Sequence, residues 1–117
     1  MPYVDGFVIA VKKDRIDDYR KMAALGAEVW MAFGALSYVE CFADDVPYGE
    51  VTSFPRAVQA TDDEVVVFSW ITYESREARD AINARVMADP RMNQFAASMP
   101  FDGKRMIYGG FQSSISR

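Results

Sequence analysis

Two ten-residue segments, YVDGFVIAVK at 3–12 and EVVVFSWITY at 64–73, carry large apolar side chains at both odd and even positions. Their β-branched and aromatic residues predict two β-strands. An antiparallel sheet with one face in water alternates apolar with polar residues, and these segments do not alternate in this way. The predicted sheet is therefore apolar on both faces, and both faces need cover.

Helical spacing appears between the predicted strands. Apolar residues recur at three- and four-residue steps after Asp14, which we expect to cap a helix that ends at Gly34. Turn and capping signals predict the remaining elements: a strand over 35–43, a long connection to about residue 62, a helix over 76–88 capped by Ser75, a helical turn over 91–97, and a strand over 104–112 with Gly109-Gly110 as a bulge or close backbone approach. The order βαββαβ, with right-handed crossovers, predicts one α+β domain over residues 1–117 that folds as a ferredoxin-like sandwich.

In this sandwich the helices cover one sheet face, and the other face needs a partner. We expect the uncovered face to hold Tyr3, Phe7, Ile9, Val66, Phe68 and Trp70. Leaving them in water forfeits on the order of 10 kcal/mol, at about 1.5 to 3 kcal/mol for each large apolar side chain. A second copy packed face to face about a two-fold axis is the economical cover, with the 45–62 connection supplying contacts at the rim.

Composition excludes several classes of function. The net charge of -4 has the wrong sign for a surface that neutralises phosphates, so we expect no nucleic-acid partner. The apolar run 65–71 is far shorter than the roughly 20 residues that span a bilayer, so we expect no membrane insertion. A single cysteine, Cys41, and no basic leader segment favour the cytoplasm. Because the chain has no histidine, Ser-His-Asp triads and the usual zinc sites are excluded, and the acidic clusters match no other metal motif.

Two acidic residues lie on predicted strands among apolar neighbours. Asp5 shares a face with Tyr3 and Phe7, and Glu40 shares one with Tyr38. A buried carboxyl has a raised pKa, which suits a general base. Asp5 and Glu40 are therefore candidate catalytic bases, with Arg105 or Lys104 as the cation that compensates their charge and Arg105 as the group that stabilises developing negative charge. The alternative is a salt bridge that fixes strand or subunit register.

Three aromatic residues are candidates for the wall of a small-molecule pocket: Tyr38, Trp70 and Tyr108. Ligand pockets combine aromatic walls with a few polar tips. Packing in a dimer core is the alternative role for the same side chains.

Three stretches resemble one protein family: YVDGFV at 3–8, FSW at 68–70 and, most specifically, PFDGKRMIYGGF at 100–111. They are similar to the YbaA-like family, domain of unknown function 1428. The resemblance implies a dimeric α+β barrel, an arrangement shared with small cofactor-free monooxygenases of antibiotic biosynthesis. It implies no established activity, substrate or catalytic group.

Two functions remain open from the sequence, and the residues do not decide whether the chain is an enzyme. One is a homodimer that binds a small, partly aromatic molecule or performs cofactor-independent, monooxygenase-like chemistry on it, with no cofactor and no metal. The other is a non-catalytic dimer that takes part in a stress response or in protein interactions.

Overall fold

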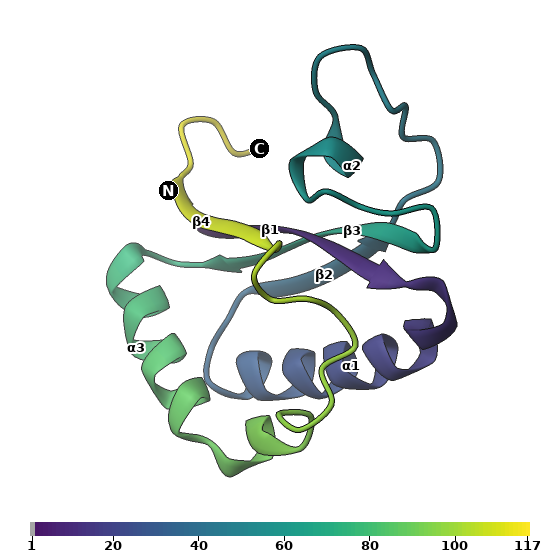
Figure 1. The fold of residues 1–117 in the computed structure, drawn as a ribbon. Coiled ribbons are helices and arrows are strands. Elements are labelled where there is room, and N and C mark those ends of the chain that lie inside the picture. The colour runs from purple at the N-terminus through teal and green to yellow at the C-terminus, as the bar shows by residue number, and fades with distance from the viewer. Residues whose placement is uncertain (1) are drawn as a thin grey trace.

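The computed structural model describes residues 2–117 and has a ferredoxin-like α+β architecture. Four antiparallel strands form one sheet in the order β2-β3-β1-β4. The two long helices, α1 (Ile16–Ala32) and α3 (Arg76–Ala88), lie on one face of the sheet. The connection between β2 and β3 and the C-terminal tail lie on the other face (Figure 1). The predicted fold class is confirmed.

The two central strands have the predicted bounds, β1 at Tyr3–Lys12 and β3 at Glu64–Tyr73. They pair along their whole length, from Tyr3 opposite Tyr73 to Lys12 opposite Glu64. The edge strands are shorter than predicted, β2 at Ser37–Phe42 and β4 at Ile107–Gln112. Because β1 and β3 are paired on both sides, their backbone hydrogen bonds leave no free edge at the centre of the sheet.

The helices begin at different signals. Ser75 caps α3 as predicted, since its hydroxyl accepts a hydrogen bond from the Ala78 amide at 3.1 Å. The predicted cap at Asp14 is wrong: a 3-10 turn, η1 (Lys13–Arg15), follows β1 directly and places Asp14 inside helical backbone. A cap residue needs extended backbone at the helix start, and this turn removes it. Gly34 ends the first helix with a φ of 110°, a left-handed conformation that glycine adopts at little cost.

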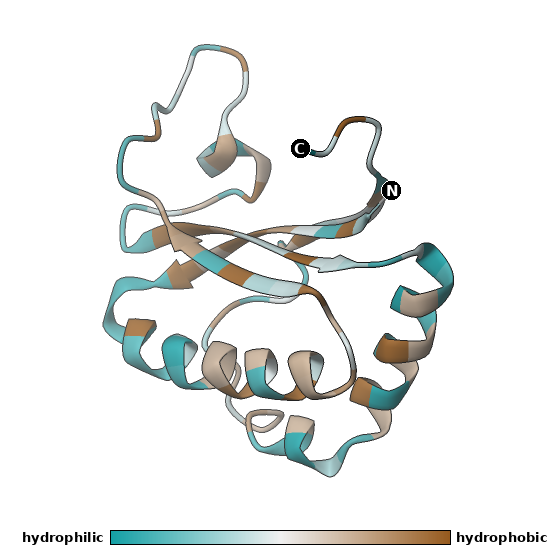
Figure 2. Ribbon diagram, turned by 180° about the vertical axis from the view of Figure 1, so that it is seen from behind, coloured by the Kyte–Doolittle hydropathy of each residue, from teal (hydrophilic) through white to brown (hydrophobic). Residues whose placement is uncertain are grey.

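The main core lies between the sheet and the helices. On α1 the buried residues Tyr19, Ala23, Gly26 and Val29 form one stripe at helical spacing. Val29 packs with Ile82 and Val86 of α3 against one part of the sheet, and Tyr19 and Ala23 pack on Ile9, Val11 and Val67 in another. Figure 2 shows hydrophobic residues along the strands and an alternation of hydrophobic and hydrophilic residues along both long helices, as amphipathic helices require.

The sequence pattern placed residues of β1 and β3 together on the uncovered face, and the β1 half of that assignment is wrong. Pairing sets Ile9 opposite Val67 and Ala10 opposite Val66. Directly opposed residues share a face, so Tyr3, Phe7 and Ile9 face the helices, whereas Val66, Phe68 and Trp70 face away from them. The sequence pattern alone could not align the two strands, and a shift of one residue exchanges the faces.

The connection between β2 and β3 covers part of the second face. It contains a one-turn helix, α2 (Phe54–Ala57), followed by a fully buried Val58 that packs on Val8, Ala10 and Val66. The Phe54 ring lies 5.6 Å from the Phe68 ring. The connection therefore packs directly on one end of this face. From the sequence, we expected it to contribute only contacts at the rim of a dimer interface.

Apolar side chains remain exposed on the rest of this face, which we call the open face. Phe68 of β3 is 44% exposed, and Ile107 and Phe111 of β4 are 45% and 64% exposed. Clusters of this kind are uncommon on monomers unless they serve an interaction.

Within residues 2–117, no helix is both long and apolar enough to cross a membrane.

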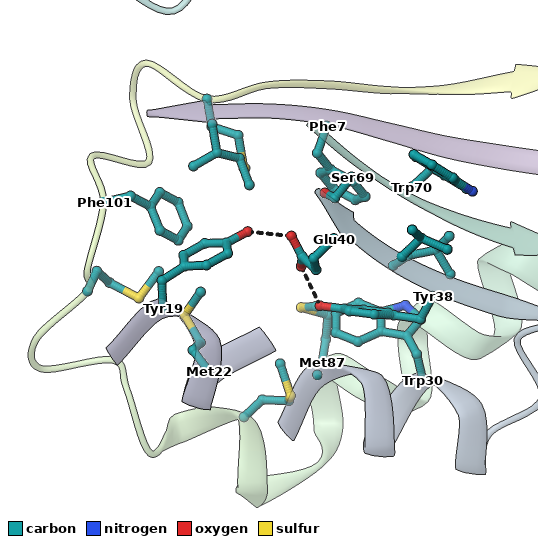
Figure 3. Close-up of a pocket in the computed structure, with 17 residues that line it drawn as sticks. Phe7, Tyr19, Met22, Trp30, Tyr38, Glu40, Ser69, Trp70, Met87 and Phe101 are labelled. Carbon is teal, nitrogen blue, oxygen red and sulfur yellow. Dashed lines mark hydrogen bonds between the residues drawn. The ribbon is translucent and has the colours of Figure 1, made fainter. Parts of the chain in front are cut away.

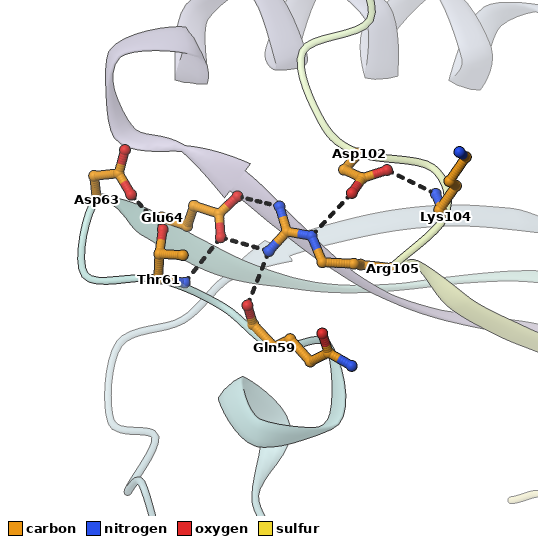
Figure 4. A network of polar contacts seen from close by, with 7 residues as sticks. All are labelled: Gln59, Thr61, Asp63, Glu64, Asp102, Lys104 and Arg105. Carbon is orange, nitrogen blue, oxygen red and sulfur yellow. Dashed lines mark hydrogen bonds and ion pairs between the residues drawn. The ribbon is translucent and has the colours of Figure 1, made fainter.

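An arginine ties the connection to the sheet (Figure 4). Arg105 forms two hydrogen bonds with the Glu64 carboxylate, at 2.8 and 2.6 Å, and a third with the Gln59 carbonyl at 2.9 Å. The Glu64 side chain is 3% exposed and also accepts the Thr61 amide. This ion pair lowers the pKa of Glu64 to about 2. Sheet, connection and the turn before β4 are joined at this one point.

A second ion pair lies at the opposite end of β1. Arg79 of α3 lies 3.4 Å from the Asp5 carboxylate and donates to the Tyr3 hydroxyl at 3.0 Å. Both contacts lie against Gly110 of β4, where a Cβ atom would clash with the Arg79 guanidinium and the Tyr3 hydroxyl. The paired register of β4 is unbroken at this point, so the glycine marks a close approach and not a bulge.

Candidate functional site

A cavity of about 300 Å³ lies between the sheet and α1 (Figure 3). Its remaining wall is the strap, residues 89–106, which runs from the end of α3 past α1 to β4. The cavity is at the small end of the range of about 300 to 1,000 Å³ for ligand pockets. Its lining is mainly aromatic and sulfur-containing, with Phe7, Tyr19, Trp30, Tyr38, Phe101, Met22, Met87, Met92, Met99 and Met106.

The carboxyl group of Glu40 enters this apolar space from β2. Its Oε1 accepts the Tyr19 hydroxyl at 2.7 Å and its Oε2 accepts the Tyr38 hydroxyl at 3.0 Å. Ser69 lies opposite Glu40 in the β2–β3 register, and its hydroxyl also acts to lower the pKa of Glu40. Across residues 2–117, no lysine or arginine forms an ion pair with this carboxylate. Burial raises the pKa of Glu40, and the three neighbouring hydroxyl groups offset only part of that rise.

The two tyrosines come from different elements and are held as hydrogen-bond donors. Burial and the nearby Glu40 raise the pKa of Tyr19 and the pKa of Tyr38. Both hydroxyls therefore keep their protons at physiological pH. The Tyr38 hydroxyl reaches Glu40 over Gly26 of α1, where a Cβ atom would lie only 2.7 Å from it. The glycine keeps the space that this hydroxyl occupies.

An arginine fastens the strap that closes the cavity. Arg15 donates to the main-chain carbonyls of Met99 and Ser98, at 3.0 and 3.2 Å, and to the Ser98 hydroxyl at 3.1 Å. The same guanidinium pairs with Asp18 at 3.2 Å. The start of α1 is thereby joined to the part of the strap that carries Met99 and Phe101 into the cavity wall.

Of the six site residues predicted from the sequence, the structure brings Glu40 and Tyr38 together in the cavity, 3.0 Å apart. Trp70 is also among the residues that line the cavity, but its ring packs against Phe68, with 5.5 Å between centroids, on the open face.

The other three predicted site residues lie elsewhere. Asp5 is paired with Arg79, and Arg105 is paired with Glu64, so Arg105 is not the compensating cation expected for Asp5 or Glu40. Tyr108 is 73% exposed on β4, beside a groove that Ile107 and Phe111 also line. Residues far apart in sequence set these pairings, and strand spacing alone does not reveal them.

Sequence reasoning missed the contribution of Tyr19 and of the methionines. Tyr19 belongs to the apolar stripe of α1, where spacing alone marks it as a core residue. A signal was available, because a buried tyrosine hydroxyl requires a partner and a glutamate on an inward strand position requires donors. Among residues 2–117, no group of three or more histidine, cysteine, aspartate or glutamate side chains is placed to hold a metal ion.

Removing the charge of Glu40 should not destabilise the fold. Because the folded-state pKa of Glu40 is raised, the native state holds a proton that the unfolded state releases, and stability falls as pH rises through that window. A Glu40→Gln variant lacks the carboxyl group whose titration causes this loss of stability. We expect the variant to gain stability relative to the wild type as pH increases above 4.5, measured by urea unfolding. If the variant instead loses stability relative to the wild type as pH rises, the pKa of Glu40 is not raised in the folded state.

The fold and the cavity between its layers define a ferredoxin-like α+β protein with a pocket on the helix side of the sheet. The sequence model of the family described as "Protein of unknown function (DUF1428)" matches residues 2–103, and the chain belongs to this family. It is 62% identical over 115 residues to the uncharacterized protein YbaA of Escherichia coli K12 and to that of Shigella flexneri, covering 98% of this chain and 98% of each relative.

Solved structures with low sequence identity share the fold. Rv0793 from Mycobacterium tuberculosis is 15% identical with a TM-score of 0.60, covering 99% of this chain and 98% of that one. A NIPSNAP family protein of unknown function from Agrobacterium tumefaciens is 17% identical with a TM-score of 0.56, covering 94% and 86%. A dimeric ferredoxin-like protein from an uncultured marine organism is 12% identical with a TM-score of 0.58, covering 100% of both chains.

Proposed function

We propose that this protein binds a small, largely apolar molecule in the cavity and that Glu40 acts there as a general base. One observation carries the proposal: a half-buried carboxyl with a raised pKa, held by hydroxyl donors and not by a cation, faces a cavity with apolar walls. A structural ion pair would contain a cation. A carboxyl with a pKa nearer neutrality is suited to accept a proton from a bound molecule.

The cavity walls support an aromatic ligand. The Trp30 and Tyr38 rings pack against each other at a tilt of 44°, with 5.9 Å between centroids, and methionine side chains adapt to the shape of what they contact. The volume admits a molecule of one or two rings. Proton removal by Glu40 needs no cofactor, which agrees with the cofactor-independent chemistry expected from the sequence.

A ligand panel tests the binding. We expect some one- and two-ring aromatic compounds to raise the melting temperature by about 5 to 10 °C at a hundredfold excess over Kd. A Met22→Trp variant fills the cavity from α1 and should lose the shift. Met31→Trp is the matched control, because Met31 lies on the same helix, is 45% exposed and does not line the cavity. No shift across a broad panel, or an equal shift in both variants, would refute binding at this site.

We also propose that the protein is a homodimer joined through the open face. The exposed side chains of Phe68, Ile107 and Phe111 support it, and a structural neighbour with the same fold is described as dimeric. Sedimentation velocity should show a dimer for the wild type and a folded monomer for Phe68→Lys. Met31→Lys, on the helix side, should remain dimeric. A monomeric wild type at micromolar concentration would overturn this proposal.

The second candidate function is a non-catalytic interaction protein, and the same exposed side chains favour it. The two experiments separate the candidates. A dimer that binds no compound of the panel would leave the interaction function, whereas ligand binding that depends on an open cavity supports the first proposal.

A further inference from the structure

We infer that the molecule bound beside Glu40 is a neutral acid whose conjugate base carries its charge on oxygen, a phenol or an enolisable ketone, and that Tyr19 and Tyr38 donate hydrogen bonds to that oxygen once the proton has passed to Glu40. This inference rests on the proposed function and specifies its substrate class. It follows from the charges and donors that the cavity contains.

The cavity excludes ligands that arrive as anions. Within the described chain, the residues that line it include no lysine or arginine, and its one ionisable acid is Glu40. A carboxylate or phosphate ligand would place a second negative charge beside Glu40 in an apolar space. Two like charges close together repel each other, and the walls of this cavity supply no cation that would compensate the second charge.

The cavity is also poorly suited to an ammonium ligand. An ammonium group carries three N–H donors and requires three acceptors. The carboxylate of Glu40 already accepts hydrogen bonds from Tyr19 and Tyr38, and the other walls are mainly aromatic rings and thioethers. Most ammonium protons would be desolvated without a partner, which costs more than one ion pair returns. A ligand with a single acidic proton makes no such demand.

Proton transfer in this cavity conserves charge. The ligand's C–H or O–H bond breaks, the proton forms an O–H bond on a Glu40 carboxyl oxygen, and the electron pair remains on the ligand, with the charge on its oxygen. The cavity holds one negative charge before and after the step. No oxidant, reductant or further reactant is required.

The Tyr19 and Tyr38 hydroxyls donate hydrogen bonds both before and after the proton transfer. Tyr19 and Tyr38 contact different oxygens of Glu40, at 2.7 and 3.0 Å, and reach it from α1 and β2 (Figure 3). When Glu40 gains the proton it becomes a weaker acceptor, and a rotation about each C–O bond redirects the hydroxyl hydrogen to the new oxyanion. Donors fixed in place before the reaction stabilise the developing charge without reorganising a solvent shell.

A matched series of two-ring compounds tests the substrate class: naphthalene, beta-naphthol, beta-naphthoate and beta-naphthylmethylammonium. The inference expects beta-naphthol to bind about tenfold more tightly than naphthalene, the gain from about one net hydrogen bond, and the two charged compounds to bind more weakly than naphthalene. Titration calorimetry on the full chain measures each Kd.

Deuterium exchange tests the proton transfer. In deuterated buffer, the wild type should accelerate exchange of the acidic C–H protons of beta-tetralone, an enolisable ketone of similar size, by about a hundredfold over buffer. Glu40→Gln should abolish the acceleration. Tyr19→Phe and Tyr38→Phe should each reduce it at least tenfold, whereas Tyr48→Phe, which alters an exposed tyrosine of the connection, should not.

The outcomes separate this inference from the proposed function. If no naphthalene compound and no compound of the broad panel binds, the proposed binding function itself is refuted. If only other compounds of the panel bind, the substrate class is wrong and the binding function stands. If they bind but a charged compound binds most tightly, or naphthol shows no advantage over naphthalene, only the substrate class is wrong. Tight naphthol binding without exchange that depends on Glu40 would overturn the proton-transfer step.

Discussion

An Arg105→Met variant is expected to lose about 3 kcal/mol of unfolding free energy at pH 7, the scale of breaking a buried ion pair from one side. The loss arises because the Glu64 carboxylate, 3% exposed, would keep its charge without its partner. Two hydrogen bonds to that carboxylate and one to the Gln59 carbonyl disappear together. Urea unfolding monitored by tryptophan fluorescence measures the change.

Two further variants identify the cause of that loss. Asp102→Asn removes the exposed acidic partner of the same guanidinium and should cost less than about 1 kcal/mol. The double variant Arg105→Met/Glu64→Gln removes the stranded charge and should recover part of the stability lost in Arg105→Met. If the double variant is as unstable as the sum of the two single variants, the ion pair is not the source of the effect.

The same pair predicts an acid transition. The pKa of Glu64 is lowered from 4.5 to about 2, so the unfolded state takes up the proton first as the solution is acidified. The contribution of Glu64 to stability is complete above pH 4.5 and is lost as pH falls toward 2. Unfolding free energies measured across this interval should fall less steeply for Glu64→Gln than for the wild type.

A Gly110→Ala variant is expected to lose about 2 to 4 kcal/mol, because its Cβ atom would displace a buried ion pair. The new atom would overlap the Arg79 guanidinium and the Tyr3 hydroxyl and lie 2.8 Å from a Tyr3 ring carbon. Moving Arg79 would leave Asp5, 8% exposed, without its cation. Chemical denaturation measures this loss.

The neighbouring glycine supplies the control. A Cβ atom at Gly109 meets only the Phe111 ring, at 3.6 and 3.8 Å, which is ordinary contact. Gly109→Ala should therefore be neutral or stabilise the protein by up to about 1 kcal/mol through the unfolded chain. Equal losses in the two variants would show that the strand, and not the ion pair, is sensitive to substitution.

Local patterns predicted most of the fold. The bounds of β1, β3 and α3 follow from β-branched runs and from the Ser75 cap, which act over a few residues. The assignment of faces failed where two strands had to be aligned, because both strands are apolar on both sides and either register appears acceptable in isolation. Register depends on tertiary contacts, such as Val58 seated on Val8 and Val66, that no single segment encodes.

Only part of the candidate site was predicted, because local spacing does not reveal partners that lie on other elements. Glu40 and Tyr38 stand two residues apart on one strand, so period-two spacing places them on one face. Tyr19 lies on another element, and its role depends on a hydroxyl that periodicity treats like a phenylalanine ring. The partners of Arg105 and Asp5 lie 41 and 74 residues away along the chain, too far for spacing to reveal.

The hydrogen bonds from Arg15 end largely on main-chain oxygens of the strap, which every amino acid provides. The Met99 side chain, in contrast, forms part of the cavity wall. Substitution at position 99 can therefore change which molecules fit the cavity while the hydrogen bonds from Arg15 to the main chain remain. For protein engineering, this makes the strap a place where ligand preference can be redesigned separately from stability, with position 99 as the first to randomise.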